Sequence, residues 1–237
     1  MDLTSRSRRR IAFGAALAVG ALSLTGCSAD KLTTPCAVVV DGSGSGAKFD
    51  AATRLKDRLN DFAVEQKCGQ LAFVPIDGAP VGSVCTQKTL PMDPDLGGNS
   101  DQETVRTGRR TLALTRANAM LECARQNPSS DVLGALRRAA DQRPPGDGTY
   151  QVLVVSDMLQ NAGDLSLYKM ELGTEAAMTK AVDTVAAQAP KLAGMRLDIT
   201  DCGVTLSSSK KAVEVKTFWT RLFKTAAVGD PEVDFER

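Results

Sequence analysis

Five oxygen-bearing side chains stand where they could hold a hard metal ion. Asp41, Ser43 and Ser45 alternate with glycines directly after an apolar run. The glycines let the backbone curl, so that one carboxylate and two hydroxyls can converge. Asp157 follows another apolar run, and Ser130 precedes a segment with helical spacing. Carboxylates and hydroxyls suit Mg²⁺, Ca²⁺ or Mn²⁺, so the pattern predicts a divalent-cation site for which Mg²⁺ is the first candidate.

The chain contains no histidine. The usual general base of hydrolases, the usual partner of a Ser or Cys nucleophile and the commonest zinc ligand are therefore missing. The glycines around Ser43 and Ser45 are also out of phase with the Gly-x-Ser-x-Gly pattern of a nucleophile elbow. We therefore expect a non-catalytic protein, and a metal-dependent hydrolase that uses the same oxygen cluster is the less favoured alternative.

Short apolar runs alternate with segments of helical spacing along the chain. The expected strands are residues 37–40, 71–76, 150–155 and 195–199, with a further short strand around 83–87 and a loop at 42–46. The expected helices are residues 49–62, 103–125, 131–142, 176–189 and 213–226. This alternation predicts an α/β fold, a three-layer, doubly wound, mainly parallel sheet with helices on both faces. Ligands bind at the carboxyl edge of such sheets, where the five side chains are expected to meet.

Three segments, in order, resemble the von Willebrand factor A domain family. Residues 38–45 (VVVDGSGS) resemble its first strand and the D-x-S-x-S motif of its metal-ion-dependent adhesion site. Residues 130–136 (SDVLGAL) resemble its T-x-x-x-x-A-L segment, and residues 152–157 (VLVVSD) resemble the strand that ends in its second aspartate. The resemblance covers residues 36–227 and implies a Rossmann-like domain that binds a protein partner through a divalent metal.

The resemblance also implies a role for each candidate ligand. The hydroxyls of Ser43 and Ser45 would bind the metal directly. Ser130 would be a direct or water-mediated ligand, whereas Asp41 and Asp157 would act largely through bound water. A sixth position would be open to an acidic group of a surface or envelope protein.

Two positions depart from the family pattern. Ser130 stands where the family has threonine, which removes one methyl group and keeps the oxygen donor. Met158 stands where the family often has glycine, directly after the second aspartate. The alternative to a working site is a structural envelope lipoprotein with a vestigial site, in which the ligands are splayed or blocked by Met158.

The first residues are typical of an export signal. Four arginines precede residues 11–24, an apolar run that would form a helix of about 21 Å, shorter than a bilayer core of roughly 30 Å. Residues 24–27 (LTGC) resemble the bacterial lipobox, which implies cleavage before Cys27 and acylation of that cysteine. We therefore expect a signal peptide at residues 1–26, a lipidated cysteine and tether at 27–35, and one domain at 36–237. The protein would be anchored to the cell membrane on its extracytoplasmic face.

The charge of the remaining chain excludes one class of partner. Without residues 1–26 it has 211 residues, of which 25 are basic and 27 acidic, a net charge of −2. Nucleic-acid binding needs a concentrated basic surface, so we do not expect it. A chain of this length can bury one sizeable core, which is consistent with a single domain.

Six cysteines are present, and lipidation of Cys27 would leave five. Five cannot all pair within one chain, so at least one is expected to be free, buried or intermolecular. Outside the cytoplasm the others tend to pair. Cys36 and Cys68 precede strands expected to be parallel neighbours, so they are the first candidate pair, and Cys85–Cys123 is the second. The sequence alone does not fix the connectivity or say which cysteine, such as Cys202, is left over.

Two other features have less specific patterns. Residues 93–101 partly imitate a calcium-binding loop, but they lack the fifth-position ligand and the final glutamate, which favours an ordinary acidic loop. The apolar face around Trp219 is typical of a helix that covers a sheet rather than of a membrane-binding helix.

Overall fold

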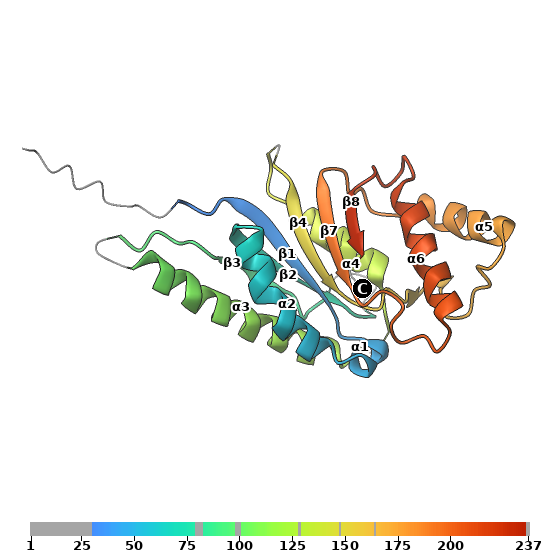
Figure 1. Ribbon diagram of the computed structural model, residues 1–237, viewed down its shortest axis with the longest axis horizontal. Helices are drawn as coiled ribbons and strands as arrows, with labels where there is room; N and C mark the ends of the chain where they lie inside the picture. The colour runs from blue at the N-terminus through green and yellow to red at the C-terminus, as the bar shows by residue number, and fades with distance from the viewer. Residues whose placement is uncertain are drawn as a thin grey trace, which may run out of the picture.

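The fold is a six-stranded, mostly parallel sheet with helices on both faces. A computed structural model describes residues 30–78, 83–97, 101–127, 129–146, 148–163 and 165–235. The sheet has the order β3-β2-β1-β4-β7-β8, in which only the pairing of β2 with β3 is antiparallel (Figure 1). Its strands are β1 (Thr34–Asp41), β2 (Cys68–Ile76), β3 (Gln87–Pro91), β4 (Tyr150–Val155), β7 (Met195–Thr200) and β8 (Glu232–Phe235). The expected α/β, doubly wound class is confirmed.

Six helices and a small hairpin complete the described part of the chain. The helices are α1 (Gly44–Lys48), α2 (Ala51–Glu65), α3 (Gln102–Ala124), α4 (Val132–Asp141), α5 (Glu175–Ala186) and α6 (Ser209–Phe223). The hairpin is formed by β5 (Asn161–Ala162) and β6 (Leu165–Ser166). No helix in the described ranges is long and apolar enough to cross a membrane.

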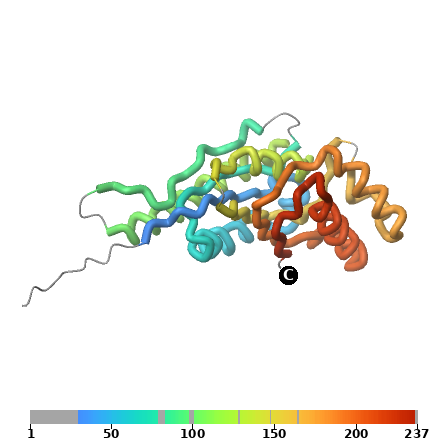
Figure 2. The backbone as a smooth tube through the Cα atoms, turned by 90° about the horizontal axis from the view of Figure 1, so that it is seen from above, coloured from blue at the N-terminus to red at the C-terminus, as the bar shows by residue number. Residues whose placement is uncertain are grey.

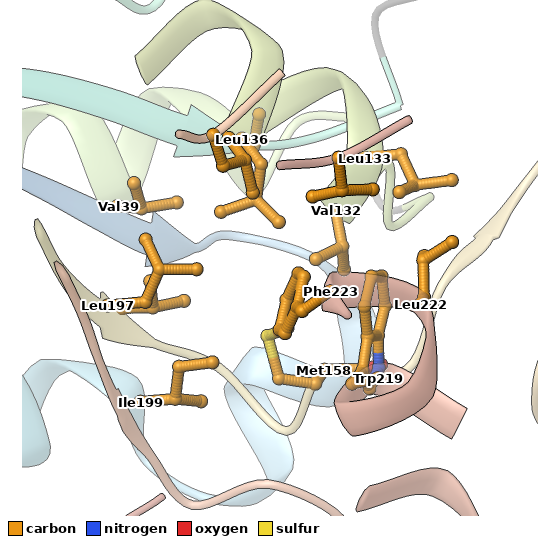
Figure 3. Packing of buried hydrophobic residues seen from close by; sticks show 14 of the residues in the cluster. Val39, Val132, Leu133, Leu136, Met158, Leu197, Ile199, Trp219, Leu222 and Phe223 are labelled. Atoms are coloured by element: carbon orange, nitrogen blue, oxygen red, sulfur yellow. The ribbon is translucent and has the colours of Figure 1, made fainter. Parts of the chain in front are cut away.

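Each face of the sheet has its own hydrophobic core. Successive residues of a strand point to opposite faces, so Val38 and Val40 pack under α2 and α3. Val39 joins the other core, to which α4, α5 and α6 contribute, with Trp219 fully buried (Figure 3). Burial of these apolar faces is the main force that fixes the helices on the sheet.

Three elements differ from the sequence-based expectation. The glycine-rich segment after β1 contains the short helix α1 rather than only a loop. The third strand, β3, begins at Gln87, where the expected strand of residues 83–87 ends. The edge strand β8 has no apolar run, because its residues alternate between exposed and half-buried, so hydrophobicity gave no signal for it.

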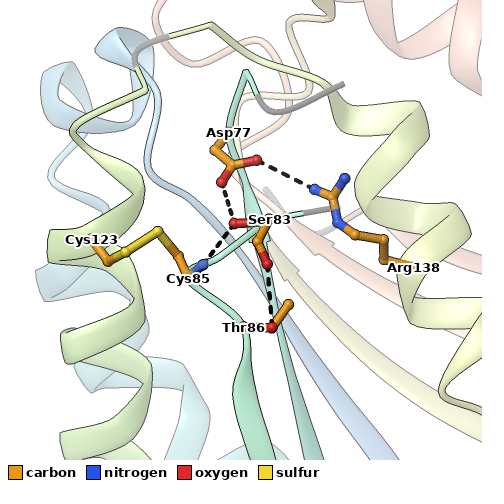
Figure 4. The surroundings of a disulfide bond; sticks show 6 residues. All are labelled: Asp77, Ser83, Cys85, Thr86, Cys123 and Arg138. Carbon is orange, nitrogen blue, oxygen red and sulfur yellow. Dashed lines mark hydrogen bonds and ion pairs between the residues drawn. A yellow bond between two sulfur atoms is a disulfide. The ribbon is translucent and has the colours of Figure 1, made fainter. Parts of the chain in front are cut away.

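Both candidate disulfides are present. Cys36–Cys68 joins the starts of β1 and β2, and Cys85–Cys123 joins the segment before β3 to the last turn of α3 (Figure 4). Cys202 is free and half-buried. The proposed signal peptide and Cys27 lie outside the described residues.

Candidate functional site

The two candidate aspartates lie at the same edge of the sheet. Asp41 is the last residue of β1, and Asp157 follows the end of β4 by two residues. The two strands are parallel neighbours in which Val40 pairs with Val155, so their carboxyl ends emerge together. Both carboxylates are fully buried.

Hydrogen bonds connect four of the five predicted ligands. The Ser43 amide donates to Asp41 Oδ1 over 2.9 Å. The hydroxyl oxygens of Ser43 and Ser45 lie 3.0 Å apart. Ser45 Oγ in turn donates to Asp157 Oδ1 over 3.2 Å, across 112 residues of sequence. Asp41, Ser43, Ser45 and Asp157 therefore form one continuous cluster of oxygen atoms.

The fifth predicted ligand, Ser130, is buried beside the segment that follows Asp157. Its carbonyl oxygen accepts a hydrogen bond from the Asn161 amide over 2.8 Å, and only 3% of the residue is exposed. Its hydroxyl has no hydrogen-bond partner in the described part of the structure. An unpartnered buried hydroxyl is costly, so this oxygen is available to a ligand.

Two side chains and one backbone amide, which the sequence patterns did not single out, also hold the carboxylates. Ser156 Oγ donates to Asp41 Oδ2 over 2.8 Å. Thr205 Oγ1 donates to Asp157 Oδ2, and the Leu159 amide reaches Asp157 Oδ1 over 3.1 Å. Ser156 could have been noticed because it precedes the aspartate. Thr205 lies in a loop without periodicity, and nothing in the sequence indicates its role.

In the part of the chain that the structure describes, no ion pair neutralises the cluster directly, although the charge of Lys48 in α1 acts to lower the pKa of Asp157. In the described ranges no lysine or arginine nitrogen lies within 4.0 Å of either carboxylate. Burial, and then the charge of Asp157, raise the pKa of Asp41 to about 6. Burial likewise raises the pKa of Asp157, although its hydrogen bond from Thr205 opposes the shift. A divalent cation would supply the positive charge that these buried carboxylates lack.

Two glycines are required here by close packing. A Cβ on Gly46 would lie 2.1 Å from the carbonyl oxygen of Asp41, so a side chain there would push α1 away from β1. A Cβ on Gly42 would lie 2.3 Å from the Cβ of Ala124, where α3 ends. The motif therefore depends on glycine to bring Ser45 and the end of α3 close to the strand end.

Met158 does not block the cluster. Its side chain is fully buried among the core residues that include Trp219 and Phe223 (Figure 3). Its backbone has a φ of 58°, in the left-handed region, and its carbonyl oxygen accepts a hydrogen bond from Trp219 Nε1 over 2.8 Å. Met158 therefore packs into the core on the side of α6 and forms no part of the oxygen cluster.

The donor set fits a hard cation that relies on hydroxyl groups and water. Within the described ranges no three carboxylate or thiol side chains are grouped so that they could hold a metal ion. The cluster instead combines two carboxylates with the hydroxyls of Ser43 and Ser45, a set that suits Mg²⁺ or Ca²⁺ better than zinc, and no hydrogen bond joins Ser130 to it in the described ranges. A scan against protein-family models and a search of the curated proteins found no match for this chain.

Proposed function

We propose that this chain is a membrane-anchored, extracytoplasmic binding module that holds a protein partner through a divalent metal ion. The observation that carries the proposal is the cluster of two buried carboxylates, which serine hydroxyls connect and no direct ion pair neutralises in the described ranges. A cation would stabilise the charged forms of Asp41 and Asp157, whose pKa values burial raises. Mg²⁺ is the preferred metal, with Ca²⁺ and Mn²⁺ as alternatives.

The proposed roles follow the contacts. Ser43, Ser45 and Ser130 would offer hydroxyl oxygens to the metal, and Asp41 and Asp157 would supply negative charge, largely through water. A bound metal would provide a positive charge that attracts an oxygen ligand from outside. The partner is therefore expected to present an acidic group, such as an aspartate or glutamate side chain.

The location is part of the proposal. Residues 1–26 would be removed as a signal peptide, and Cys27 would carry the lipid that anchors residues 36–237 through the tether of residues 27–35. The two disulfides are of a kind that persists in an oxidising compartment, which supports a position outside the cytoplasm. The net charge of −2 gives no reason to expect a nucleic acid as partner.

Thermal unfolding with and without Mg²⁺ tests the metal. A ligand that binds only the folded protein at about 100 times its Kd adds about 2.7 kcal/mol of stability, so the melting temperature should rise with Mg²⁺ and fall back with chelator. The rise should vanish in Asp41→Asn. Asp198→Asn is the matched control, because Asp198 is a half-buried carboxylate of β7 whose pKa burial also raises, outside the cluster.

Capture of a partner from solubilised membranes tests whether the metal ion is needed for partner binding. Capture by the wild type should require Mg²⁺ and should be lost in Asp41→Asn but kept in Asp198→Asn. A melting temperature indifferent to Mg²⁺, Ca²⁺ and Mn²⁺, together with capture that chelator does not affect, would leave only the structural alternative. Metal-dependent phosphoester turnover that disappears in Asp157→Ala would instead support the hydrolase.

A further inference from the structure

A buried ion pair lies far from the candidate site. Arg106, near the start of α3, meets Asp93 through two bonds, from Nε to Oδ1 over 2.9 Å and from Nη2 to Oδ2 over 3.0 Å. Only 10% of the Arg106 side chain and 3% of the Asp93 side chain are exposed. Gln102 Nε2 adds a third bond to Asp93 Oδ1 over 2.5 Å. Burial of two charged groups costs desolvation free energy, which is offset only when both groups are fully hydrogen-bonded. The other hydrogen bonds of Arg106 and Asp93 are therefore part of what stabilises the pair.

Those contacts hold the backbone that leads into β1. The Leu32 amide donates to Asp93 Oδ2 over 2.7 Å, and Arg106 Nη2 donates to the Asp30 carbonyl oxygen over 2.6 Å. The two bonds span 61 and 76 residues of sequence. The carbonyl oxygen of Leu32 also lies 2.2 Å from where a Cβ on Gly69 would be, so β2 packs directly against this segment. The supposed acidic loop around Asp93 is therefore half of a clamp on residues 30–32.

The clamp and the candidate site lie at opposite ends of α3. Arg106 is in the second turn of α3, and the helix ends at Ala124, which packs against Gly42 beside the site. The 18 residues between them span about 27 Å at 1.5 Å per residue. Both views show the start of β1 and the start of α3 together at one end of the molecule (Figure 1 and Figure 2), and Figure 1 places α1 away from that end.

The clamp shortens the chain that would connect the domain to a lipid on Cys27. Two residues, Ser28 and Ala29, separate Cys27 from Asp30, so the connection can reach at most about 10 Å. Without the clamp, the first residue packed against the sheet would be Leu32, beside Gly69. The connection from Cys27 would then have a reach of about 17 Å. The ion pair thus shortens the available tether by roughly two fifths.

We propose that the Asp93–Arg106 clamp holds this end of the domain against the bilayer and turns the metal site toward the side away from the membrane. The inference rests on the proposed lipid anchor at Cys27. It also narrows the partner, which must present its acidic group from outside the anchoring membrane. A membrane-embedded segment or a lipid headgroup of the same bilayer would face the wrong end of the domain.

Two labels on one helix test the orientation. Gly108→Cys places a fluorophore near the clamp, where an added Cβ meets nothing within 4 Å. Glu122→Cys places it near the site, at a side chain that is 66% exposed. The two positions are 14 residues apart on α3, about 21 Å along its axis. The full lipidated chain is reconstituted into phosphatidylcholine vesicles that carry nitroxide headgroup quenchers, with the chain that lacks an added cysteine as the background for Cys202.

The expected result is strong quenching of the Gly108→Cys label and little quenching of the Glu122→Cys label. Eight Gly/Ser residues inserted after Ser28 leave the clamp and the fold intact and lengthen the free tether, so quenching at Gly108→Cys should fall. Arg106→Gln, which releases residues 30–32, should have the same effect. Because that variant removes a buried partner and is at risk of unfolding, the insertion is the decisive comparison.

Three outcomes overturn the proposal, and each has a different meaning. Equal quenching of both labels, or stronger quenching at Glu122→Cys, contradicts the orientation. Unchanged quenching after the insertion shows that the tether does not set it. Failure of the unlabelled chain to float with vesicles removes the lipid anchor, and the orientation with it. If Mg²⁺ does not raise the melting temperature but the quenching pattern is as expected, metal-dependent partner binding is contradicted and the orientation is still supported.

Discussion

The two ends of the sheet both bury carboxylates, but they neutralise them in different ways. At the end where residues 30–32 enter, a guanidinium group pairs with Asp93 and holds the pKa of that carboxyl well below its usual range. At the opposite end, Asp41 and Asp157 receive hydrogen bonds only from neutral donors, and burial raises their pKa values. The first arrangement is complete without a ligand. The second is stabilised by anything that brings positive charge, which is what a binding site requires.

A third aspartate shows that the contrast does not come from the sheet edge itself. Asp77 follows β2 at the same edge as Asp41 and is fully buried. Arg138 lies 3.6 Å from its Oδ1, and Ser83 donates a hydrogen bond to its Oδ2 (Figure 4). The edge therefore carries one carboxylate with an arginine partner and two without. Arg138 pairs directly with Asp77, whereas Asp41 and Asp157, beside Ser43 and Ser45, have no direct ion pair in the described ranges.

The largest expected effect is the loss of the clamp. Arg106→Gln leaves the largely buried Asp93 without its cation, with hydrogen bonds from Leu32 and Gln102, so we expect a loss of about 3–5 kcal/mol in the free energy of unfolding, measured by urea denaturation. The matched control is Arg110→Gln, because Arg110 bonds to Glu103, which is 63% exposed. Such surface pairs contribute about 1 kcal/mol or less. Equal losses in the two variants would show that the buried pair is no stronger than the exposed one.

Removal of either disulfide should come next. The two bridges close loops with sequence separations of 32 and 38 residues, so chain entropy predicts a similar loss of about 3–4 kcal/mol for each. Their effects on the site should differ. Cys85→Ala with Cys123→Ala frees the last turn of α3, which packs beside the site, and should weaken the Mg²⁺-dependent rise in melting temperature. Cys36→Ala with Cys68→Ala acts at the other end and should leave that rise unchanged. An equal reduction in both pairs would contradict a local role.

The free energy of unfolding should depend on pH with opposite signs for the carboxylates at the two ends of the sheet. Without metal, Asp41 binds its proton more tightly in the folded protein, with a pKa of about 6, than in the unfolded chain. The free energy of unfolding should therefore fall as pH rises from about 4 to 6, by a value on the order of 3 kcal/mol. Asp93 behaves oppositely, because its lowered pKa gives stability that is present above about pH 4 and lost in more acidic solution.

Variants separate the two windows. Asp41→Asn should reduce the fall between pH 4 and 6, to which the raised pKa of Asp157 also contributes, and leave the acid limb in place. Asp93→Asn should do the reverse. Saturating Mg²⁺ should also flatten the upper window in the wild type, since the metal favours the ionised carboxylate. A wild-type curve that rises between pH 4 and 6 without metal would contradict the raised pKa of Asp41.

The sequence predicted the parts of the site that obey a local pattern. Asp41 and Asp157 could be placed because each follows an apolar strand, and strand ends share one edge in a parallel sheet. The contact of Thr205 with Asp157 spans 48 residues and depends on how an irregular loop folds back. The bond from Leu32 to Asp93 is equally remote from any periodicity. Local patterns thus located the ligands, whereas the groups that hold them needed the tertiary structure.

The smallest predicted effect concerns one of those supporting groups. Thr205→Val keeps the shape of the side chain and removes the hydroxyl that donates to Asp157 Oδ2. Asp157 would be less firmly positioned, and Mg²⁺ affinity measured by calorimetry should fall by about 1 kcal/mol, or roughly fivefold. Thr205→Ser restores the donor and should bind as the wild type does. Thr217→Val is the control, because its hydroxyl bonds only to the Val213 carbonyl oxygen within α6. If Thr205→Val binds Mg²⁺ as tightly as Thr205→Ser does, the carboxylates are positioned by the strands alone, and the loop has no part in the site.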